Sequence, residues 1–576
     1  MIIANRQISI DLVPLKKIIC FAGLLFTASI IFFCVFYLTS DYQQLTKWYL
    51  SLNSCFYKSG SWSDNFFTLH TKNTGNILAI AAMPVAFYFS LSLTGKIRRY
   101  KNAAHPFMVS VVGAIWTCAV VALALIAGIW SWSLAAPAYD EVFSAVNCAE
   151  LHPFQTLSYY MLPNNHIYFN FLNNILFGRI HHTIGTGRLF SLMSYIGVTV
   201  TAFYWLYHKI ENRLYALLCL LPIALQFMTW GLAAQARGYE LQLLCAWISF
   251  VSLLCYLHSK QANLLRLNAL CCMAGFSMLS TFLHYFLAQL AFILILNIFD
   301  RKVQWQFFKY QLYVVAIVFL LYLPAFCFSG IPAFTANRYV TPAYPTWQAF
   351  FPDFSNLLRY FINCCFSMIF GEDRVPNFVL FFLPLSLFFF KKKEQKLIGL
   401  FYVLLWLVFI VITLYMRRIP FTRNMVLHFS LTMGIIAYSF YVLIQKATSI
   451  IPSPSIRKAT LTTAISVSAL CYGIYLIKTD HRDIAHFIYY NDVNDIYTGH
   501  LNELTWIPQN ATIAFSDECF FTYYLFRKDH PNAHRCPTGN EAYYIKRKDE
   551  PLPHILEGSY IKWRDGYEDY EYYIKK

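Results

Sequence analysis

The sequence predicts an all-α polytopic membrane protein with about 13 transmembrane helices, outward-facing surface helices and a small C-terminal α/β domain. Three observations predict this class. Hydrophobic residues make up 58% of the 576 positions and charged residues only 13%, about half the charged fraction of a soluble domain. Apolar runs of about 20 residues, long enough to cross a membrane as helices, recur along the chain. After residue 477 the composition changes, and acidic residues and polar turns become frequent.

The apolar runs define thirteen predicted spans. The first follows Arg6, Lys16 and Lys17 and has the charge pattern of a signal sequence. No small-residue cleavage pattern follows it, so we expect it to remain as a span. The spans lie near residues 17–39, 75–95, 107–134, 188–208, 213–230, 236–258, 266–280, 283–299, 311–329, 376–390, 397–415, 424–444 and 459–477.

Basic residues alternate between the connections, and this pattern predicts the orientation. Connections rich in lysine and arginine stay in the cytoplasm, so the long loops 40–74, 135–187 and 330–375 and the C-terminal tail are expected outside. The net charge of +16 follows from these loops and does not indicate a nucleic-acid partner. We expect an integral multi-pass protein of a bacterial inner membrane with its active site on the extracytoplasmic side. The cytoplasmic connections carry Lys96, Arg98, Arg99, Lys101, Lys209, Arg213, Lys260, Arg266, Arg301, Lys302, Lys309, Lys391, Lys392, Lys393, Lys396, Lys446, Arg457 and Lys458.

Three regions follow from this organisation: N-terminal spans with an outer loop (1–106), a transmembrane core (107–477) and an outer α/β tail (478–576). In the tail, residues 506–515 predict a turn leading into a strand, and residues 519–526 predict the following helix. Cys519 and Cys536 would be able to pair in an oxidising compartment, and two free thiols are the alternative. No C-x-x-C pair and no P-loop occurs, which argues against a zinc ribbon, a redox motif or an ATP-driven pump.

The loop after the run 107–134 begins with two adjacent carboxylates, Asp140 and Glu141. Acidic groups at a membrane surface are costly and usually have a task. One interpretation is that they cap the helix that begins there. The functional interpretation makes Asp140 the general base that takes a proton from an acceptor hydroxyl during sugar transfer from a phosphate carrier. Adjacent helical residues point about 100° apart, so we expect Glu141 to position the acceptor or Asp140 instead.

Elimination supports this choice, because the chain before the tail has only 13 carboxylates. Most of the others belong to cytoplasmic connections or to a solvated outer loop. Glu372 and Asp373 are the fallback acidic site if the loop 330–375 covers the cavity. The carboxylates near the outer face are Asp140, Glu141, Glu150, Glu240, Asp353, Glu372 and Asp373.

A second polar cluster, residues 235–240, opens the sixth predicted span. Arg237 and Glu240 are three residues apart and would be able to pair along a helix. Alternatively, Arg237 binds a phosphate, because its planar guanidinium offers two parallel donors. Tyr239 and Glu240 would then line the same cavity.

A third group consists of outer arginines. Three of them lie within seven residues on the side of the membrane that disfavours positive charge, which indicates an anionic ligand. Snorkelling to lipid headgroups would explain one or two of them. We expect the donor phosphate at Arg237, Arg338, Arg417, Arg418 and Arg423. We expect His166, His284 and Tyr285, together with Tyr239 and Glu240, to line the cavity.

These segments, in this order, resemble the type C (GT-C) membrane glycosyltransferases, closest to the protein O-mannosyltransferase and lipid A aminoarabinose transferase superfamily. Tyr139-Asp-Glu-Val-Phe143 and Pro163-Asn-Asn-His-Ile-Tyr-Phe-Asn-Phe171 look like their first outer loop. Gln235-Ala-Arg-Gly-Tyr239 is similar to the Gln-Glu-Ala-Arg-x-Tyr stretch of bacterial members, without the Glu. Leu283-His-Tyr285 resembles their Thr-His-Tyr, and Arg423-Asn424 stands where they have Arg-Tyr.

The resemblance covers roughly residues 107–444 and implies inverting transfer of a sugar from a polyprenyl phosphate. It also implies a catalytic base at the Asp140 position, in a cavity open to the membrane and the outer compartment. Two departures stand out. Two extra spans precede the acidic loop, and Asn164-Asn165 replaces an expected Pro-Leu, which leaves the acceptor open.

We therefore expect a glycosyltransferase that uses a polyprenyl-phosphate sugar donor and an acceptor that is an envelope glycan, a glycolipid or a protein. The alternatives are a transporter or flippase of lipid-linked glycans and a glycan polymerase or ligase. A transporter usually carries polar residues near the bilayer midplane, whereas here they gather at the outer ends of spans. The sequence indicates no cofactor with certainty. A divalent metal stays open, because no ligand set with metal-site spacing occurs.

Overall fold

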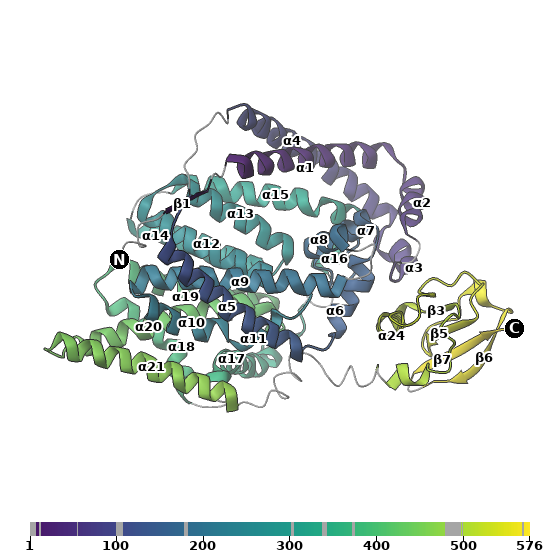
Figure 1. The fold of residues 1–576 in the computed structure, drawn as a ribbon. Helices are drawn as coiled ribbons and strands as arrows, with labels where there is room; N and C mark the ends of the chain where they lie inside the picture. The colour runs from purple at the N-terminus through teal and green to yellow at the C-terminus, as the bar shows by residue number, and fades with distance from the viewer. Residues whose placement is uncertain are drawn as a thin grey trace.

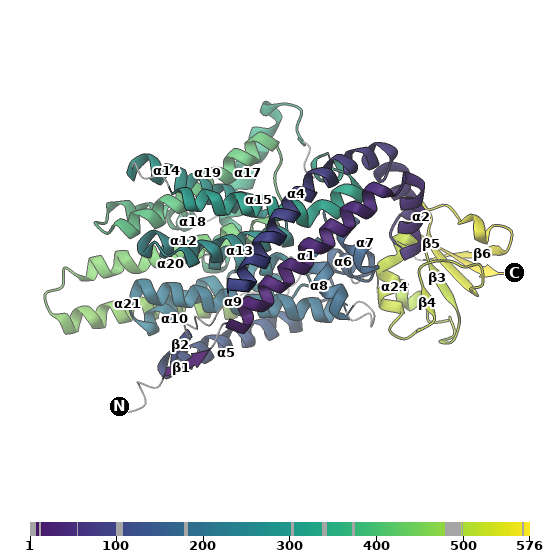
Figure 2. The same ribbon diagram turned by 90° about the horizontal axis from the view of Figure 1, so that it is seen from above.

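The computed structural model describes the chain except for eleven short stretches. These are residues 1–6, 11–12, 54–55, 100–106, 178–182, 301–303, 337–341, 371–374, 479–496, 498 and 567–568. The helices form an elongated bundle, and a small domain made by the tail lies at one end of it (Figures 1 and 2). The prediction of a helical, multi-span membrane protein with a C-terminal α/β domain is confirmed.

Nine helices in the described part of the chain are long and apolar enough to cross a membrane. Each coincides with one of the thirteen predicted spans. They are α1 (Val13–Thr39), α4 (Leu69–Arg99), α5 (Val111–Leu134), α9 (Thr183–Ile210), α12 (Tyr239–Ser259), α14 (Phe282–Asp300), α15 (Trp305–Ser329), α19 (Lys393–Met416) and α20 (Val426–Thr448).

The other four predicted spans are also helical, but within the described residues none of them is both long and apolar enough to cross a membrane. The prediction of about 13 spans is therefore higher than the nine candidates among the described residues. The segment 213–230 breaks where Gln226 starts a new helix by accepting a hydrogen bond from Thr229 N at 3.0 Å. In the segment 376–390, α-helix gives way to a 3₁₀-helix. The elements are α10 (Arg213–Ala224) with α11 (Phe227–Leu232), α13 (Ala262–Met278), α18 (Val375–Phe382) with η5 (Leu383–Phe389), and α21 (Pro454–Lys478).

The start of the run 107–134 also differs from the prediction of one continuous helix. Residues Phe107–Ser110 form strand β2, which pairs antiparallel with β1 (Gln7–Ile10). The apolar stretch becomes helical only at Val111. Apolar β-branched residues suit both states, so composition alone did not separate strand from helix.

Shorter helices cover the end of the bundle that faces the tail. One of them, α2, begins with a capping box, in which Asp41 and Gln44 each accept a hydrogen bond from the other's backbone N–H. They are α2 (Tyr42–Leu52), α3 (Ser59–Ser61), η2 (Trp62–Phe66), α6 (Tyr139–Ser144), η3 (Ala145–Ala149), α7 (Pro153–Ser158), α8 (Ile167–Phe177), α16 (Pro332–Thr335) and η6 (Thr422–Met425). The longer helix α17 (Trp347–Phe370) packs instead against α18 and α21.

The two N-terminal spans pack against α15 through their own aromatic cluster. The Tyr37 hydroxyl donates to the Cys327 carbonyl at 3.0 Å, and the Trp62 indole donates to the Phe328 carbonyl at 2.9 Å. The Tyr49 ring stacks on both Trp62 and Phe328, with centroids 4.3 and 4.8 Å away. This module therefore adds to the main core without entering it.

The tail is a five-stranded mixed sheet with strand order β4-β3-β5-β7-β6. The predicted strand and helix near residues 506–526 are present as β3 and α24. Cys519 is a free, buried thiol, whereas Cys536 is disulfide-bonded, so these two cysteines do not pair with each other. The elements are β3 (Ile513–Phe515), η7 (Asp517–Cys519), α24 (Phe520–Phe526), β4 (Ala533–His534), β5 (Tyr543–Arg547), η8 (His554–Leu556), β6 (Tyr560–Asp565) and β7 (Tyr570–Lys575).

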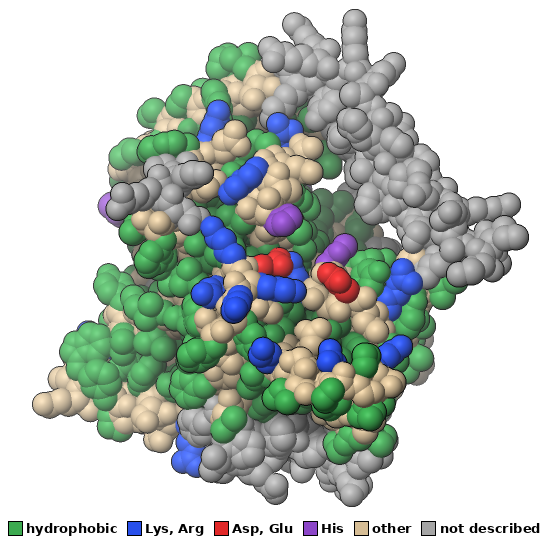
Figure 3. All heavy atoms as spheres, turned by 90° about the vertical axis from the view of Figure 1, so that its left-hand side faces the viewer, with side chains coloured by type: hydrophobic (Ala, Val, Ile, Leu, Met, Phe, Trp, Pro, Cys, Tyr) green, Lys and Arg blue, Asp and Glu red, His purple; other side chains and the backbone are tan. Residues whose placement is uncertain are grey.

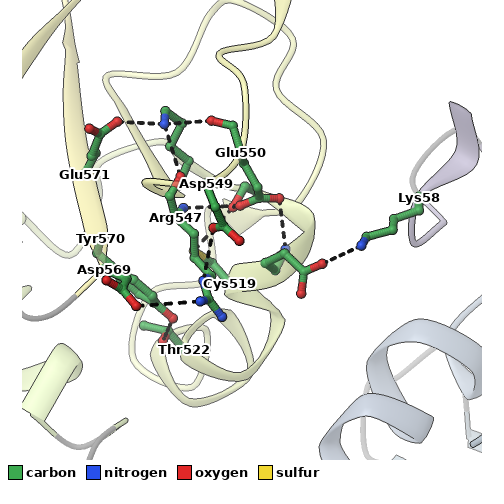
Figure 4. A network of polar contacts seen from close by, with 12 residues as sticks. Lys58, Cys519, Thr522, Arg547, Asp549, Glu550, Asp569, Tyr570 and Glu571 are labelled. Carbon is green, nitrogen blue, oxygen red and sulfur yellow. Dashed lines mark hydrogen bonds and ion pairs between the residues drawn. The ribbon is translucent and has the colours of Figure 1, made fainter. Parts of the chain in front are cut away.

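Two ion pairs join the tail to the loops of the bundle. Lys58 reaches across so that its Nζ lies 2.8 Å from the Glu518 carboxylate (Figure 4). The Arg527 guanidinium donates to both oxygens of Glu150, at 2.6 and 2.8 Å, and both side chains are largely buried. The tail is therefore packed onto the end of the bundle that carries α6 and η3.

The opposite face of the bundle is basic. Figure 3 shows Lys and Arg side chains gathered on the face turned away from the tail. The connections after α9 and α12 and before α19 supply exposed or half-exposed residues of this kind, among them Arg213, Lys260 and Lys392. The basic face and the tail thus lie at opposite ends of the bundle, as the distribution of charge predicts.

Candidate functional site

A polar pocket of about 140 Å³ lies near the ends of several helices, among loops that come from distant parts of the chain. The segment before α8, the start of α12, the turn between α13 and α14, and η6 all contribute. It is lined by Asp140, Tyr160, Pro163, Asn164, Asn165, His166, Arg237, Tyr239, Met278, Leu279, Ser280, Thr281, Tyr322, Phe421, Arg423 and Asn424.

Asp140 is the carboxylate of this pocket. Its Oδ2 lies 2.7 Å from an Arg423 guanidinium nitrogen, and its Oδ1 accepts a hydrogen bond from the Asn164 amide at 2.9 Å. About a quarter of each charged side chain is exposed, 27% for Asp140 and 24% for Arg423. A ligand in the pocket is therefore able to reach both.

The surroundings of Asp140 favour its ionised form. Burial raises the pKa of the carboxyl group, but the positive charges of Arg237 and Arg423 and the hydrogen bond from Asn164 together lower it below its ordinary value of 3.8. Asp140 is thus a carboxylate at neutral pH, and Arg423 and Asn164 hold its two oxygens in place.

Arg237 forms the floor beneath Asp140. One guanidinium nitrogen donates to the Asp140 carbonyl at 2.7 Å and to the Ser144 hydroxyl at 3.0 Å. The other lies 3.0 Å from Nε2 of His166. The predicted helical pair between Arg237 and Glu240 does not form, because these contacts turn the guanidinium toward the acidic loop.

Tyr239 completes this wall. Its hydroxyl donates to the Asn424 side chain at 3.3 Å, which ties the start of α12 to η6. The Arg237 guanidinium lies 5.6 Å from the centre of its ring. Of the predicted site residues, the structure therefore brings together Asp140, His166, Arg237, Tyr239 and Arg423.

The chain is similar to ArnT from Cupriavidus metallidurans. The ArnT structure bound to undecaprenyl phosphate matches with a TM-score of 0.48 and 10% sequence identity, over 80% of this chain and 97% of that one. The apo structure of ArnT matches with a TM-score of 0.47 and 10% identity, over 80% of this chain and 98% of that one. No protein-family model and no curated protein matches the sequence.

Glu141, in contrast to Asp140, is fully buried and does not line the pocket. Both its oxygens accept from Arg188, at 2.8 and 2.7 Å, and one also accepts from Ala236 N at 2.6 Å. The other accepts from Ala138 N at 3.2 Å, so this carboxylate also caps the start of α6. Glu141 therefore does not face the pocket. Of its two predicted roles, these contacts fit the positioning of the loop that carries Asp140 and not the positioning of the acceptor.

The side chains of three further predicted cavity residues are buried between helices instead of lining the pocket. Glu240 has no exposed surface, and neither carboxylate oxygen has a hydrogen-bond partner. The Tyr285 hydroxyl donates to Ser249 at 3.1 Å within the core. His284 lies one layer below the pocket, with Nδ1 3.0 Å from the Thr281 carbonyl. None of the three lines the pocket, because the helical turn after the entrance points them at neighbouring helices.

The remaining predicted arginines do not gather at the pocket either. Arg417 donates to the Pro345 carbonyl at 2.6 Å and lies 5.7 Å from the centre of the Trp347 ring. Arg418 does not line the pocket. Arg338, like the fallback pair Glu372 and Asp373, lies outside the described residues.

The described residues contain no group of three His, Cys, Asp or Glu side chains placed to hold a metal ion. The polar groups that line the pocket are amides, hydroxyls, one imidazole, one carboxylate and two guanidiniums. This set suits an anionic organic ligand.

Sequence reasoning missed several residues that build the site. Arg188 carried a usable signal, because a cation at the outer end of a span needs a partner. Asn164 stood in the Asn-rich segment that was already noted. Tyr160, Thr281 and Tyr322 carried no signal, because tyrosine and threonine are common in helices that face a membrane protein's interior.

Proposed function

We propose that this chain is an inverting glycosyltransferase that moves a sugar from a polyprenyl-phosphate carrier to an acceptor on the outer face of the membrane. One observation carries the proposal. A carboxylate, Asp140, shares a small pocket with two guanidiniums, Arg237 and Arg423, at the end of the helical bundle that faces the tail. A base and two phosphate ligands are the groups that this reaction requires.

In the proposed reaction, the acceptor hydroxyl attacks the anomeric carbon on the side opposite the phosphate. A carbon–oxygen bond to the acceptor forms, and the carbon–oxygen bond to the phosphate breaks. The hydroxyl proton goes to the Asp140 carboxylate, and the bonding electrons leave with the polyprenyl phosphate. Arg237 and Arg423 stabilise the charge that develops on the leaving phosphate.

The ion pair between Asp140 and Arg423 gives Arg423 a second task. The Arg423 guanidinium lies 2.7 Å from the Asp140 carboxylate and helps to lower the pKa of Asp140. A donor phosphate competes for the same guanidinium. We propose that donor binding draws Arg423 toward the phosphate, which raises the pKa of Asp140 and makes it a better base as the donor arrives.

The position of the charged groups favours transfer over transport. Asp140, Arg237 and Arg423 belong to α6, to the turn before α12 and to η6, all at helix ends. A flippase needs a polar path through the bilayer interior. The charged groups of the pocket gather at one end of the bundle, which suits a reaction at the membrane surface.

The decisive experiment compares Asp140→Asn with Asp64→Asn, a control at an exposed carboxylate in the first outer loop. Each purified variant is reconstituted in membranes with a synthetic polyprenyl-phosphate sugar and an envelope extract, and the product mass is measured. We expect Asp140→Asn to lower transfer by about 10²- to 10⁴-fold and Asp64→Asn to leave it unchanged.

Near-normal transfer by Asp140→Asn would remove the proposed mechanism. Movement of the lipid-linked sugar across the membrane without any new product would favour a flippase. The product mass also identifies the sugar and shows whether the acceptor is a glycan, a glycolipid or a protein.

A further inference from the structure

The two ring nitrogens of His166 face hydrogen-bond donors only. Nδ1 lies 2.9 Å from the backbone nitrogen of Gly238. A backbone N–H only donates and cannot turn away, whereas a guanidinium side chain is able to move, so we assign Nδ1 as the unprotonated, accepting nitrogen. A neutral imidazole has a single N–H, and here it therefore stands on Nε2.

That N–H points at another donor. Nε2 lies 3.0 Å from a guanidinium nitrogen of Arg237, which carries only hydrogens. Among the described residues, nothing accepts a hydrogen bond from Nε2. The side chain is only 3% exposed, and a buried donor without an acceptor is destabilising. The same Arg237 nitrogen also donates to the Asn164 side-chain oxygen at 3.4 Å, and its N–H that faces His166 lies beside the Nε2 N–H. One acceptor placed between these two N–H groups would satisfy both.

Protonation of the ring does not relieve this mismatch. Burial and the charges of Arg237 and Arg423 lower the pKa of His166 well below its ordinary value of 6.5. A protonated ring would also lose the bond from Gly238. The imidazole is therefore neutral, and its tautomer is fixed by the backbone.

The ring has little freedom to turn away. A Cβ at Gly238 would lie 3.2 Å from Nδ1, so the backbone approaches the ring closely, and any other residue there would make the ring shift by a few tenths of an ångström. The Tyr239 ring packs edge-on against it, with centroids 4.9 Å apart. The direction of the Nε2 N–H is therefore set before any ligand binds, and His166 and Arg237 both line the pocket.

We propose that His166 is a direct, uncharged ligand of the donor phosphate, and that its Nε2 N–H and an Arg237 N–H donate to the same phosphate oxygen. This inference rests on the proposed function. A phosphate oxygen suits the position because it has several lone pairs and no hydrogen. A neutral donor also suits it, because a third cation beside Arg237 and Arg423 would be repelled.

Two substitutions test the roles of the two ring nitrogens separately. In His166→Gln the amide nitrogen reaches the place of Nε2 and keeps a donor for the phosphate. In His166→Asn the shorter amide reaches only the place of Nδ1 and keeps the contact with Gly238. Binding of undecaprenyl phosphate to the full chain in nanodiscs, and kcat/KM for the sugar donor, are measured for both.

We expect His166→Asn to lower kcat/KM by about 10²-fold, the usual effect of removing one oxyanion donor, and to weaken lipid-phosphate binding. His166→Gln should stay within about 5-fold of the wild type. Gly238→Ala, which displaces the ring, should act like His166→Asn. Equal losses in the Gln and Asn variants with unchanged thermal unfolding, or wild-type behaviour in both, would overturn the role of His166.

The outcome also separates this inference from the proposed function. A wild-type protein that neither binds undecaprenyl phosphate nor transfers a sugar would remove both. A wild-type protein that does both, with a His166→Asn variant that binds the lipid phosphate normally, would remove only the role of His166.

Discussion

Asp140 and Glu141 are adjacent in the chain, and each lies 2.7 Å from an arginine, yet the two pairs differ in every other respect. The Glu141–Arg188 pair is buried, with exposed side-chain fractions of 0% and 6%. The Asp140–Arg423 pair is about a quarter exposed and faces the pocket. The same chemical pair is thus structural in one place and accessible to a ligand in the other.

The difference comes from the remaining hydrogen bonds. Arg188 also donates to the carbonyls of Ala135 and Ala136, at 3.0 and 3.1 Å, so the buried pair fastens the end of α5 to α9. Among the residues that the structure describes, only Asn164 and Arg423 contact the carboxylate oxygens of Asp140. A saturated ion pair holds a loop, whereas an unsaturated one at a pocket is able to exchange partners.

The largest expected effect breaks the buried pair. Glu141→Gln leaves Arg188 charged and buried without its carboxylate, and loss of one partner of such a pair costs about 3–5 kcal/mol. We expect a clear loss of folded protein in thermal unfolding of the purified chain. Asp140→Asn should unfold within a few degrees of the wild type.

A double variant, Glu141→Leu with Arg188→Met, sharpens this comparison. Replacing a buried ion pair with apolar residues of similar volume is often neutral, so much of the lost stability should return. An unchanged melting temperature in Glu141→Gln alone would show that the pair does not hold the loop.

The next effect concerns pH and the exposed pair. Arg423 helps to lower the pKa of Asp140 below 3.8, so Arg423→Gln should raise it. Because the base must be ionised, activity is lost as pH falls through its pKa, and the acidic limb of kcat/KM should move to higher pH. Arg417→Gln is the matched control, since Arg417 contacts Pro345 instead of the pocket. An acidic limb that stays at the same pH in Arg423→Gln would show that Arg423 does not control the pKa of Asp140.

The smallest expected effect concerns the tail. Arg527→Gln removes the two charged hydrogen bonds to Glu150, and such bonds contribute about 1.5–3 kcal/mol. Amide hydrogen exchange in residues 139–150 should become faster, while exchange around Asp64 stays the same. Unchanged exchange in residues 139–150 would mean that the acidic loop is held by the bundle alone.

The sequence predicted the parts of the site that depend on charge and order along the chain. Asp140, Arg237 and Arg423 stand out because charges at outer span ends are rare and costly. It did not predict that Arg417, six residues before Arg423, turns away. The αL conformation of Arg417, with φ of 41°, ends α19, and the direction of a side chain after such a turn depends on tertiary contacts.

By itself, the sequence determined a helical membrane protein, its charge asymmetry and an outer loop with a carboxylate pair, because burial in lipid restricts composition and periodicity strongly. Only the tertiary structure decided which carboxylate is buried and which faces the pocket. It also decided that both ring nitrogens of His166 face hydrogen-bond donors. These choices depend on partners that are far away in the sequence, such as Arg237 on the Asp140 carbonyl and Arg423 on the Asp140 carboxylate, and no local pattern in the chain encodes such contacts.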